Sequence, residues 1–326
     1  MNESTLSSTN IDIDHAQQQI LQLIHNIELV MYGKREVIKL CIVGLLARGH
    51  LLIEDIPGIG KTTLAQALAR SIDCSFNRIQ FTSDMLPSDI VGVSILMPKI
   101  QQFEFRAGPI FSSIVLADEI NRTPPKTQSA LLEAMSEAHV TVDGTTRPLP
   151  APFMVLATQN PIEYEGTYTL PEAQLDRFLL HISIGYPSDE DELRIMRRRN
   201  PQHALDSLTP ALTGEDILDL QNISDQVHVD DSVARYILAI VKATREHPGI
   251  RLGGSPRASM GLYEASQAYA LVSGRNYVTP GDVKVMAQPV MAHRIIAKSH
   301  GGNRVSSVHE REVVIQEILE AVSVPL

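Results

Sequence analysis

The chain has very little cysteine. Only Cys41 and Cys74 occur among its 326 residues, and neither belongs to a Cys-x-x-Cys pair. The sequence therefore predicts neither a disulfide framework nor a zinc site, and a reducing compartment fits. Long hydrophobic runs are also missing, since none approaches the ~20 residues that span a bilayer. The polar, acidic first residues lack the basic start and apolar centre of a signal peptide. We expect a cytoplasmic protein without a membrane segment.

Positive charge is scarce as well. The chain carries 28 Lys and Arg against 38 Asp and Glu, a net charge of −10. This balance disfavours a surface built mainly for nucleic acid. The hydrophobic content of 44% and charged content of 20% are those of an ordinary globular protein. The length allows two domains.

The chain does contain a phosphate-binding loop, within residues 51–69, LLIEDIPGIGKTTLAQALA. An apolar run predicts a buried strand, a glycine-containing loop follows, and Gly-Lys-Thr opens a helix. Loop glycines let backbone N–H groups face phosphate oxygens, and the helix N-terminus adds partial positive charge. We expect Lys61 to reach the β- and γ-phosphates and Thr62 to give its hydroxyl to Mg²⁺. The predicted nucleotide contacts are Pro57, Gly58, Ile59, Gly60, Lys61, Thr62 and Thr63.

One position departs from the general pattern of such loops. The first glycine of G-x-x-x-x-G-K-[ST] is replaced by Asp55. Aspartate adopts left-handed backbone geometry more readily than most residues. We expect it to be tolerated, provided that its carboxylate points away from the nucleotide.

Two acids close a second buried strand, in the sequence IVLADE at residues 114–119. Strands of a parallel sheet present their carboxyl ends at one edge, so Asp118 and Glu119 are expected beside the phosphate-binding loop. Asp118 is predicted to hold Mg²⁺, directly or through water, and Glu119 to act as general base on the attacking water. Taken alone, the pair would be interpreted as an acidic turn after a strand. Its combination with the phosphate-binding loop makes it a specific signal for a nucleotide site.

Three more residues are candidates for the site, each with an ordinary alternative. Asn160 follows a third buried strand and is placed to orient the water or contact the γ-phosphate, although Asn-Pro also simply ends strands. Arg177 suits the charge on a transferring phosphoryl group, although a surface ion pair is the commoner fate of an arginine. Arg257 stands in the first turn of a predicted helix, where a cation opposes the helix dipole. A nearby triphosphate would offset this, and the alternative is an exposed arginine.

The order of these segments predicts two domains. Strands and helices alternate over residues 12–186, which indicates an α/β nucleotide-binding core with a parallel sheet. Residues 187–326 are interpreted as a smaller all-α lid domain, and residues 1–11 as a disordered tail. Two hairpins are predicted in the core, at 92–107, inserted into a helical region, and at 138–151.

With these motifs in hand, the chain resembles the MoxR family of AAA+ ATPases over roughly residues 15–326. The matching stretches are EDIPGIGKT, LADEINRTPPKTQSALLEAMSE, ATQNP, LPEAQLDRF and SPRA. The resemblance, which includes the acidic residue in the loop, implies an AAA+ P-loop NTPase core and Mg²⁺-dependent hydrolysis of ATP to ADP and phosphate. It also implies homo-oligomeric rings, commonly hexamers, that act as chaperone-like motors to remodel, mature or activate client proteins. A partner with a von Willebrand factor A domain is often involved in this family.

The resemblance also assigns roles to single residues. It makes Asn160 sensor 1 and Arg177 the arginine finger, which reaches a nucleotide held by the neighbouring subunit. It makes Arg257 sensor 2, so that ATP is expected between the core and the lid of one subunit. Gly33 falls in the segment that lines the adenine pocket in such ATPases. The two predicted hairpins resemble the helix-2 insert and the pre-sensor-1 hairpin, which face the central pore in related motors.

Two other function classes stay open. Related inserts occur in DNA-unwinding AAA+ motors, but the acidic net charge and the lack of an added DNA-binding module argue against a nucleic-acid motor. A chelatase-type ATPase subunit for metal insertion into a tetrapyrrole shares the fold, although the motifs match MoxR more closely.

Overall fold

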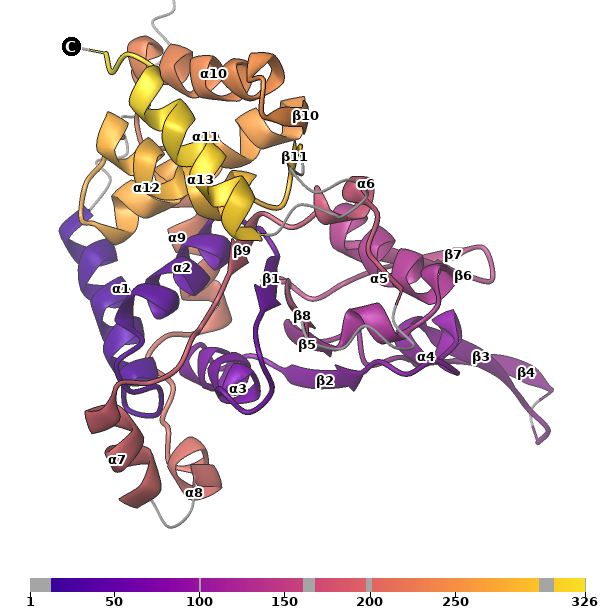
Figure 1. Cartoon of the computed structure of the whole chain (residues 1–326). Coiled ribbons are helices and arrows are strands. Elements are labelled where there is room, and N and C mark those ends of the chain that lie inside the picture. Colours follow the sequence, from indigo (N-terminus) through magenta and orange to yellow (C-terminus); the bar gives the residue numbers. More distant parts are fainter. Residues whose placement is uncertain (1–12, 100, 161–167, 198–200, 299–307, 326) are drawn as a thin grey trace, which may run out of the picture.

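A computed structural model describes residues 13–99, 101–160, 168–197, 201–298 and 308–325, and the predicted tail lies outside these ranges. A five-stranded sheet forms the centre of the first part of the chain (Figure 1). Across the sheet the strands are β2 (Phe76–Gln80), β5 (Ile114–Asp118), β8 (Met154–Gln159), β1 (Leu51–Glu54) and β9 (Leu180–Ile182). Every neighbouring pair is parallel, which confirms the predicted parallel sheet.

The register aligns the carboxyl ends of the strands. Glu54 at the end of β1 lies beside Gln159 at the end of β8, and Gln80 at the end of β2 lies beside Asp118 at the end of β5. The segments that follow β1, β5 and β8 therefore leave the sheet at one edge, where the sequence predicts the site.

Helices cover both faces of the sheet, which explains why its strands are apolar runs rather than alternating ones. Ile114 and Leu116 of β5 enter one buried cluster, and Val115 and Ala117 enter another on the opposite face. The first face is covered by α1 (Ile13–Glu28), α2 (Arg35–Leu46) and α3 (Lys61–Ser71), and the second by α4 (Pro87–Val91) and α5 (Pro125–Glu137).

Both predicted hairpins are confirmed. β3 (Gly92–Met97) pairs antiparallel with β4 (Gln102–Ala107) and projects from the body of the molecule, and β6 (His139–Val142) pairs with β7 (Thr145–Pro148) (Figure 1). The Arg147 Cζ lies 3.8 Å from the centre of the Phe105 ring, which links the two hairpins. The sequence predicts that the first hairpin is inserted into a helical region. A helix does precede β3, but turns and bends connect β4 to β5.

The second part of the chain is mainly helical, with two corrections. Its helices are α7 (Asp189–Arg197), α8 (Pro201–Asp206), α9 (Gly214–Asp225), α10 (Asp231–Glu246), α11 (Pro256–Val272), α12 (Pro280–Met291) and α13 (Val308–Ala321). The sequence does not predict α8. The predicted lid is also not entirely α-helical. Helix α12 ends at Met291, and β11 (Ile296–Ala297) pairs with β10 (Ile250–Leu252), because a short apolar run does not tell strand from helix. No helix within the described ranges is both long and apolar enough for a bilayer.

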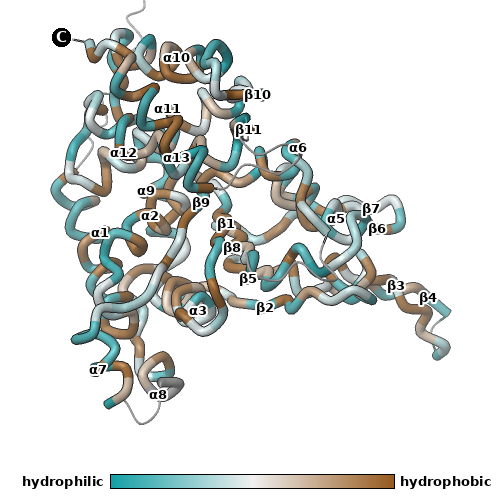
Figure 2. Tube along the Cα trace, in the orientation of Figure 1, coloured by the Kyte–Doolittle hydropathy of each residue, from teal (hydrophilic) through white to brown (hydrophobic). Residues whose placement is uncertain are grey.

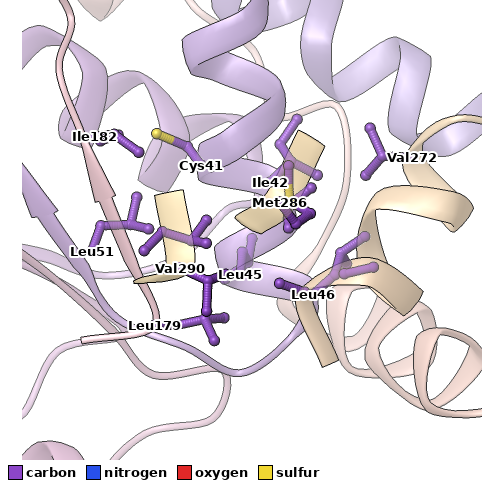
Figure 3. Close-up of a cluster of buried hydrophobic side chains, with 14 of the residues drawn as sticks. Cys41, Ile42, Leu45, Leu46, Leu51, Leu179, Ile182, Val272, Met286 and Val290 are labelled. Atoms are coloured by element: carbon purple, nitrogen blue, oxygen red, sulfur yellow. The ribbon is translucent and has the colours of Figure 1, made fainter. Parts of the chain in front are cut away.

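The helical part packs directly on the first part. Leu45 of α2 shares a buried cluster with Val272 of α11 and Val290 of α12 (Figure 3), and α2 is largely hydrophobic along its length (Figure 2). Helix α8 lies instead beside α3, where Arg70 donates to the Asp206 carboxylate at 2.7 Å (Figure 1). Helix α7 lies against Gly33 through Asp191. The domain division at residue 187 stays a prediction.

Candidate active site

The segment after β1 has the geometry of a phosphate-binding loop. Gly58 and Gly60 have φ angles of 86° and 99°, in the left-handed region that favours glycine. Helix α3 begins directly after Gly60, so the N–H groups of its first turn face the space in front of the loop. Lys61 Nζ donates to the Asp55 carbonyl oxygen at 2.5 Å, which joins the end of the loop to its start.

Asp55 is accommodated for a reason that the sequence does not predict. Its φ is not positive, so the expected left-handed geometry is wrong. Its Oδ2 accepts hydrogen bonds from Ser183 Oγ (3.0 Å) and from the backbone N–H groups of Ile184 (2.7 Å) and Gly185 (2.9 Å). Its Oδ1 accepts from the Ile56 N–H at 3.1 Å. The carboxylate is therefore turned away from the nucleotide side of the loop and holds the segment after β9.

A hollow of about 350 Å³ lies in front of the loop. We call it the loop hollow; it is lined by Pro57, Gly58, Gly60, Lys61, Thr62, Thr63, Arg78, Gln80, Asp118, Glu119 and Asn160. The structure thus brings together the loop, the two acids and Asn160, which lie far apart in the sequence. Ile59 is the exception among the predicted loop contacts, because its side chain packs against the core.

Asp118 is held from two sides. Its Oδ1 accepts from Thr158 Oγ1 at 2.6 Å, and its Oδ2 accepts from Arg78 Nε at 3.1 Å and Nη2 at 2.5 Å. A carboxylate and a threonine hydroxyl in one hollow fit a Mg²⁺ ion that takes its other oxygen ligands from phosphates and water. The described residues contain no group of three or more His, Cys, Asp or Glu for an all-protein metal site. The donor set of Thr62 and Asp118 therefore suits a metal that arrives with a nucleotide.

Glu119 directly follows β5 in left-handed geometry, with a φ of 59°. Its Oε2 accepts from Gln80 Nε2 at 2.9 Å and from Arg122 Nη1 at 3.0 Å, while its own N–H donates to Thr158 Oγ1 at 2.9 Å. These bonds fix the carboxylate at the rim of the loop hollow, as a general base requires.

Positive charge in the loop hollow comes from Lys61 and Arg78. Burial lowers the pKa of Lys61, and the nearby carboxylates, above all Asp118, oppose that shift. The ammonium is thus stabilised by the same acids that are predicted to serve the reaction.

Arg177 and Arg257 lie in a different place. Together with Arg48, Glu264 and Arg294 they line a second hollow of about 250 Å³, the arginine hollow, which shares no lining residue with the loop hollow. The guanidinium of Arg177 donates to the Leu132 carbonyl oxygen at 2.7 Å and to Ser136 Oγ at 2.5 Å, both on α5. Arg257 therefore lines a different hollow from the one in front of the loop of its own chain, and α11, which carries it, packs on α2.

Gly33 has a φ of 64°, and a Cβ there would lie 2.1 Å from Asp191 Oδ2 of α7. The neighbouring Met31 lies against the loop, since its sulfur is 3.6 Å from where a Cβ on Gly60 would stand. This segment is therefore beside the loop, and its contact with adenine stays a prediction.

Comparison with known proteins decides the family. The chain matches the ATPase family associated with various cellular activities (AAA) over residues 50–180 and the AAA lid domain over residues 242–318. It is 51% identical to the uncharacterized protein YeaC of Bacillus subtilis, over 93% of this chain and 94% of the relative. It is 42% identical to chaperone MoxR1 of Mycobacterium tuberculosis, over 93% of this chain and 81% of the relative. Protein MoxR of Paracoccus denitrificans is 30% identical, over 82% and 85% of the two chains. The chain belongs to the MoxR family of AAA+ ATPases.

The same fold has been solved in a relative of this MoxR-family chain. A crystal structure of a candidate ATPase from Cytophaga hutchinsonii matches it with a TM-score of 0.87 and 38% identity, over 96% of this chain and 97% of the other. The predicted order of an AAA+ core followed by a lid is confirmed. None of these relatives bears out the nucleic-acid motor or the chelatase subunit, and the roles of individual residues stay predictions.

The sequence does not predict three residues that hold the acids of the loop hollow. Arg78 and Gln80 of β2 and Thr158 of β8 hold the two acids. The segment FNRIQF shows the signal, since its polar residues alternate with the buried Ile79. The missing information is topological, because nothing local reveals that β2 lies beside β5 in the sheet.

Proposed function

We propose that this MoxR-family chain hydrolyses ATP to ADP and phosphate, with Mg²⁺, as one subunit of a homo-oligomeric ring. The ring, commonly a hexamer in this family, would use the motion between lid and core to remodel, mature or activate a client protein. One observation supports this most: the loop, the acid pair and Asn160 surround a single hollow. The cytoplasmic location predicted from the sequence belongs to the same proposal.

In this proposal each residue of the loop hollow has a task. The loop N–H groups and Lys61 hold the phosphates, Glu119 polarises the attacking water, and Asn160 orients it. Thr62 and Asp118 hold Mg²⁺, which when bound neutralises charge on the phosphate oxygens. Thr158 and Arg78 keep the Asp118 carboxylate oriented.

Arg177 and Arg257 are assigned to the nucleotide of the neighbouring subunit. Both line the arginine hollow, away from the loop of their own chain. A contact between the arginine hollow of one subunit and the loop hollow of the next is head-to-tail, and such contacts close into a ring when the rotation allows. Arginine then supplies planar, bidentate donors to the charge that develops on the transferring phosphoryl group.

ATPase and binding assays on three variants test the loop hollow. Lys61→Ala is expected to lose ATP binding, and Glu119→Gln to bind ATP but turn over at least about 100-fold more slowly. Lys284→Ala, an exposed lysine of α12, is the control and should match the wild type. Unchanged ATP affinity in Lys61→Ala, or normal turnover in Glu119→Gln, would contradict the proposed site.

Mixing two inactive variants tests the assignment to the neighbouring subunit. Lys61→Ala and Arg177→Ala are each expected to be inactive alone. In mixed rings some sites combine the intact loop of an Arg177→Ala subunit with the intact arginine of a Lys61→Ala subunit, so turnover should reappear. No recovery at any mixing ratio would show that Arg177 does not act across the subunit boundary.

The client is expected to come from another polypeptide, and a von Willebrand factor A domain protein is the partner class that the family suggests. The Glu119→Gln variant in ATP is designed to hold such a client without releasing it. Copurification of the partner with Glu119→Gln in ATP, and its loss with Lys61→Ala, is the expected result. Equal recovery on both variants would speak against ATP-dependent binding.

A further inference from the structure

A buried arginine holds the two residues that flank Arg177. Arg294, just after α12, donates from Nη2 to the Phe178 carbonyl oxygen at 2.8 Å and to the Asp176 carbonyl oxygen at 3.4 Å. Its Nε lies 3.3 Å from Asp176 Oδ1 in an ion pair. One side chain of the helical part therefore binds the chain on both sides of Arg177.

Two more residues of the helical part reinforce this grip. Ser255, the residue before α11, donates from Oγ to Asp176 Oδ2 at 3.0 Å. The His293 ring donates from Nε2 to the Phe178 carbonyl oxygen at 2.8 Å. Because Ser255 stands two residues before Arg257, the same contacts tie Arg177 to the start of the helix that carries Arg257.

Arg294 occupies a costly environment. Its side chain is only 4% exposed, and burial lowers its pKa to about 10, while Asp176 and Glu264 oppose the shift. The group is still charged at neutral pH. Its Nη1 finds no hydrogen-bond partner among the described residues, and a Cβ on Gly261 would lie 2.5 Å from that nitrogen.

Stability is a poor explanation for such a residue. Buried ion pairs are often no more stabilising than well-packed apolar side chains of similar volume, because both charges lose their hydration. An apolar residue would fill the same space without a desolvation cost. The arrangement that only arginine makes here uses two nitrogens of one rigid guanidinium, with Nη2 on the Asp176 and Phe178 carbonyl oxygens and Nε beside the Asp176 carboxylate.

On its other side Arg177 is bound to the core. Its guanidinium donates to Leu132 and Ser136 at the carboxyl-terminal end of α5. The backbone around Arg177 is thus held by the helical part, while its side chain rests on the core.

We propose that Arg294 is a positioning residue for ATP hydrolysis, which locks the Asp176–Phe178 segment to the helical part so that Arg177 and Arg257 meet the neighbouring nucleotide as one unit. This inference rests on the proposed action of Arg177 across the subunit boundary. Arg294 itself needs no contact with the nucleotide.

Steady-state kinetics of Arg294→Ala test the inference. A small displacement of Arg177 is expected to lower kcat by about 10- to 100-fold. KM for ATP should stay near the wild-type value, because the loop hollow is untouched. Arg294→Lys keeps the charge but has a single nitrogen for the carbonyl oxygens and the Asp176 carboxylate, so it should recover only part of kcat. Arg275→Lys is the matched control, since Arg275 pairs with Asp282 inside the helical part and away from both hollows, and its kcat should be unchanged.

A double-substitution cycle separates positioning from general damage. In an Arg177→Lys background, Arg294→Ala should lower kcat by less than about twofold, because the residue through which it acts is already impaired. An equal fold-loss in both backgrounds would overturn the inference, as would a wild-type kcat in Arg294→Ala. If Arg177→Ala loses turnover but the Arg294 variants keep it in full, the positioning role of Arg294 is overturned and the role of Arg177 stands. Full turnover in Arg177→Ala overturns the proposed role of that arginine as well.

Ser255→Ala keeps the test open if Arg294→Ala fails to fold. The Ser255 side chain makes no capping hydrogen bond to α11, so its removal breaks the Asp176 contact without uncapping the helix. Loss of one hydrogen bond to a charged group predicts a fall in kcat of about 2- to 10-fold, absent in the Arg177→Lys background. A wild-type kcat in folded Ser255→Ala would count against the inference.

Discussion

Replacing Asp55 with alanine tests how the phosphate-binding loop is held to the sheet. The carboxylate is the acceptor for the N–H groups of Ile184 and Gly185, and Ile184 is buried. Without the carboxylate, these donors lose their partner where water has poor access. A comparison of loop sequences suggests the opposite, because glycine is the usual residue at this position and Asp55→Gly would resemble a repair.

The expected loss can be worked out from the contacts. A hydrogen bond to a charged acceptor contributes about 1.5–3 kcal/mol. We count only the two backbone donors and take the low value for each, because Gly185 is half-buried and water replaces part of its bond. The free energy of unfolding should then fall by about 3 kcal/mol in Asp55→Ala. Asp55→Gly should lose as much and add the backbone entropy of glycine.

The assay is urea unfolding followed by circular dichroism, with Asp225→Ala as the matched control. Asp225 pairs with Arg48 at 2.7 Å, but its side chain is 58% exposed. Such surface pairs contribute about 0.2–1 kcal/mol. If the unfolding free energies of the two variants agree within about 0.5 kcal/mol, the Asp55 carboxylate does not secure the loop, and its geometry needs another explanation.

Two further predictions concern groups near the acids and in the core. Thr158→Val removes the donor to Asp118 Oδ1, so kcat should fall about tenfold while ATP binding persists. An unchanged kcat in ATPase assays would show that Thr158 does not support the site. His50 accepts at Nδ1 from the Val155 N–H and donates at Nε2 to Met135 O, so it is neutral, and burial lowers its pKa from 6.5 to about 4. Since the unfolded chain takes up the proton first, the free energy of unfolding should drop by about 2 kcal/mol between pH 7 and pH 5. Urea titrations of His50→Gln should lack that part of the slope, and an equal slope would refute the assignment.

The parts of the site that the sequence predicts are those built from contiguous residues. The strand, loop and helix around Lys61 lie within one run of chain, and local geometry places them correctly. The acid pair is likewise set by an apolar strand that ends in two polar residues. Parallel strands then bring these segments to one edge, so a general rule of α/β folds supplies the rest.

What the sequence does not predict depends on which segments lie side by side. Two partners of the acids, Arg78 and Gln80, come from β2, and nothing in FNRIQF identifies β5 as its neighbour. The placement of Arg257 depends on how α11 packs on α2, a contact between surfaces more than 200 residues apart. The placement of the Asp55 carboxylate is equally unpredictable, because the backbone N–H groups that bind it follow β9, far along the chain.

One helix links the two hollows within a chain. Glu119 is followed by the short helix η1 (Ile120–Arg122) and then by α5, whose 13 residues span about 20 Å. The far end of α5 carries Leu132 and Ser136, the acceptors for Arg177. A shift of the segment around Glu119 would therefore reach Arg177 through a rigid element, and in the proposed ring it would pass through Arg177 to the nucleotide of the next subunit. Mixed rings of wild-type and Glu119→Gln subunits test this coupling. We expect turnover to fall more steeply than in proportion to the fraction of Glu119→Gln subunits.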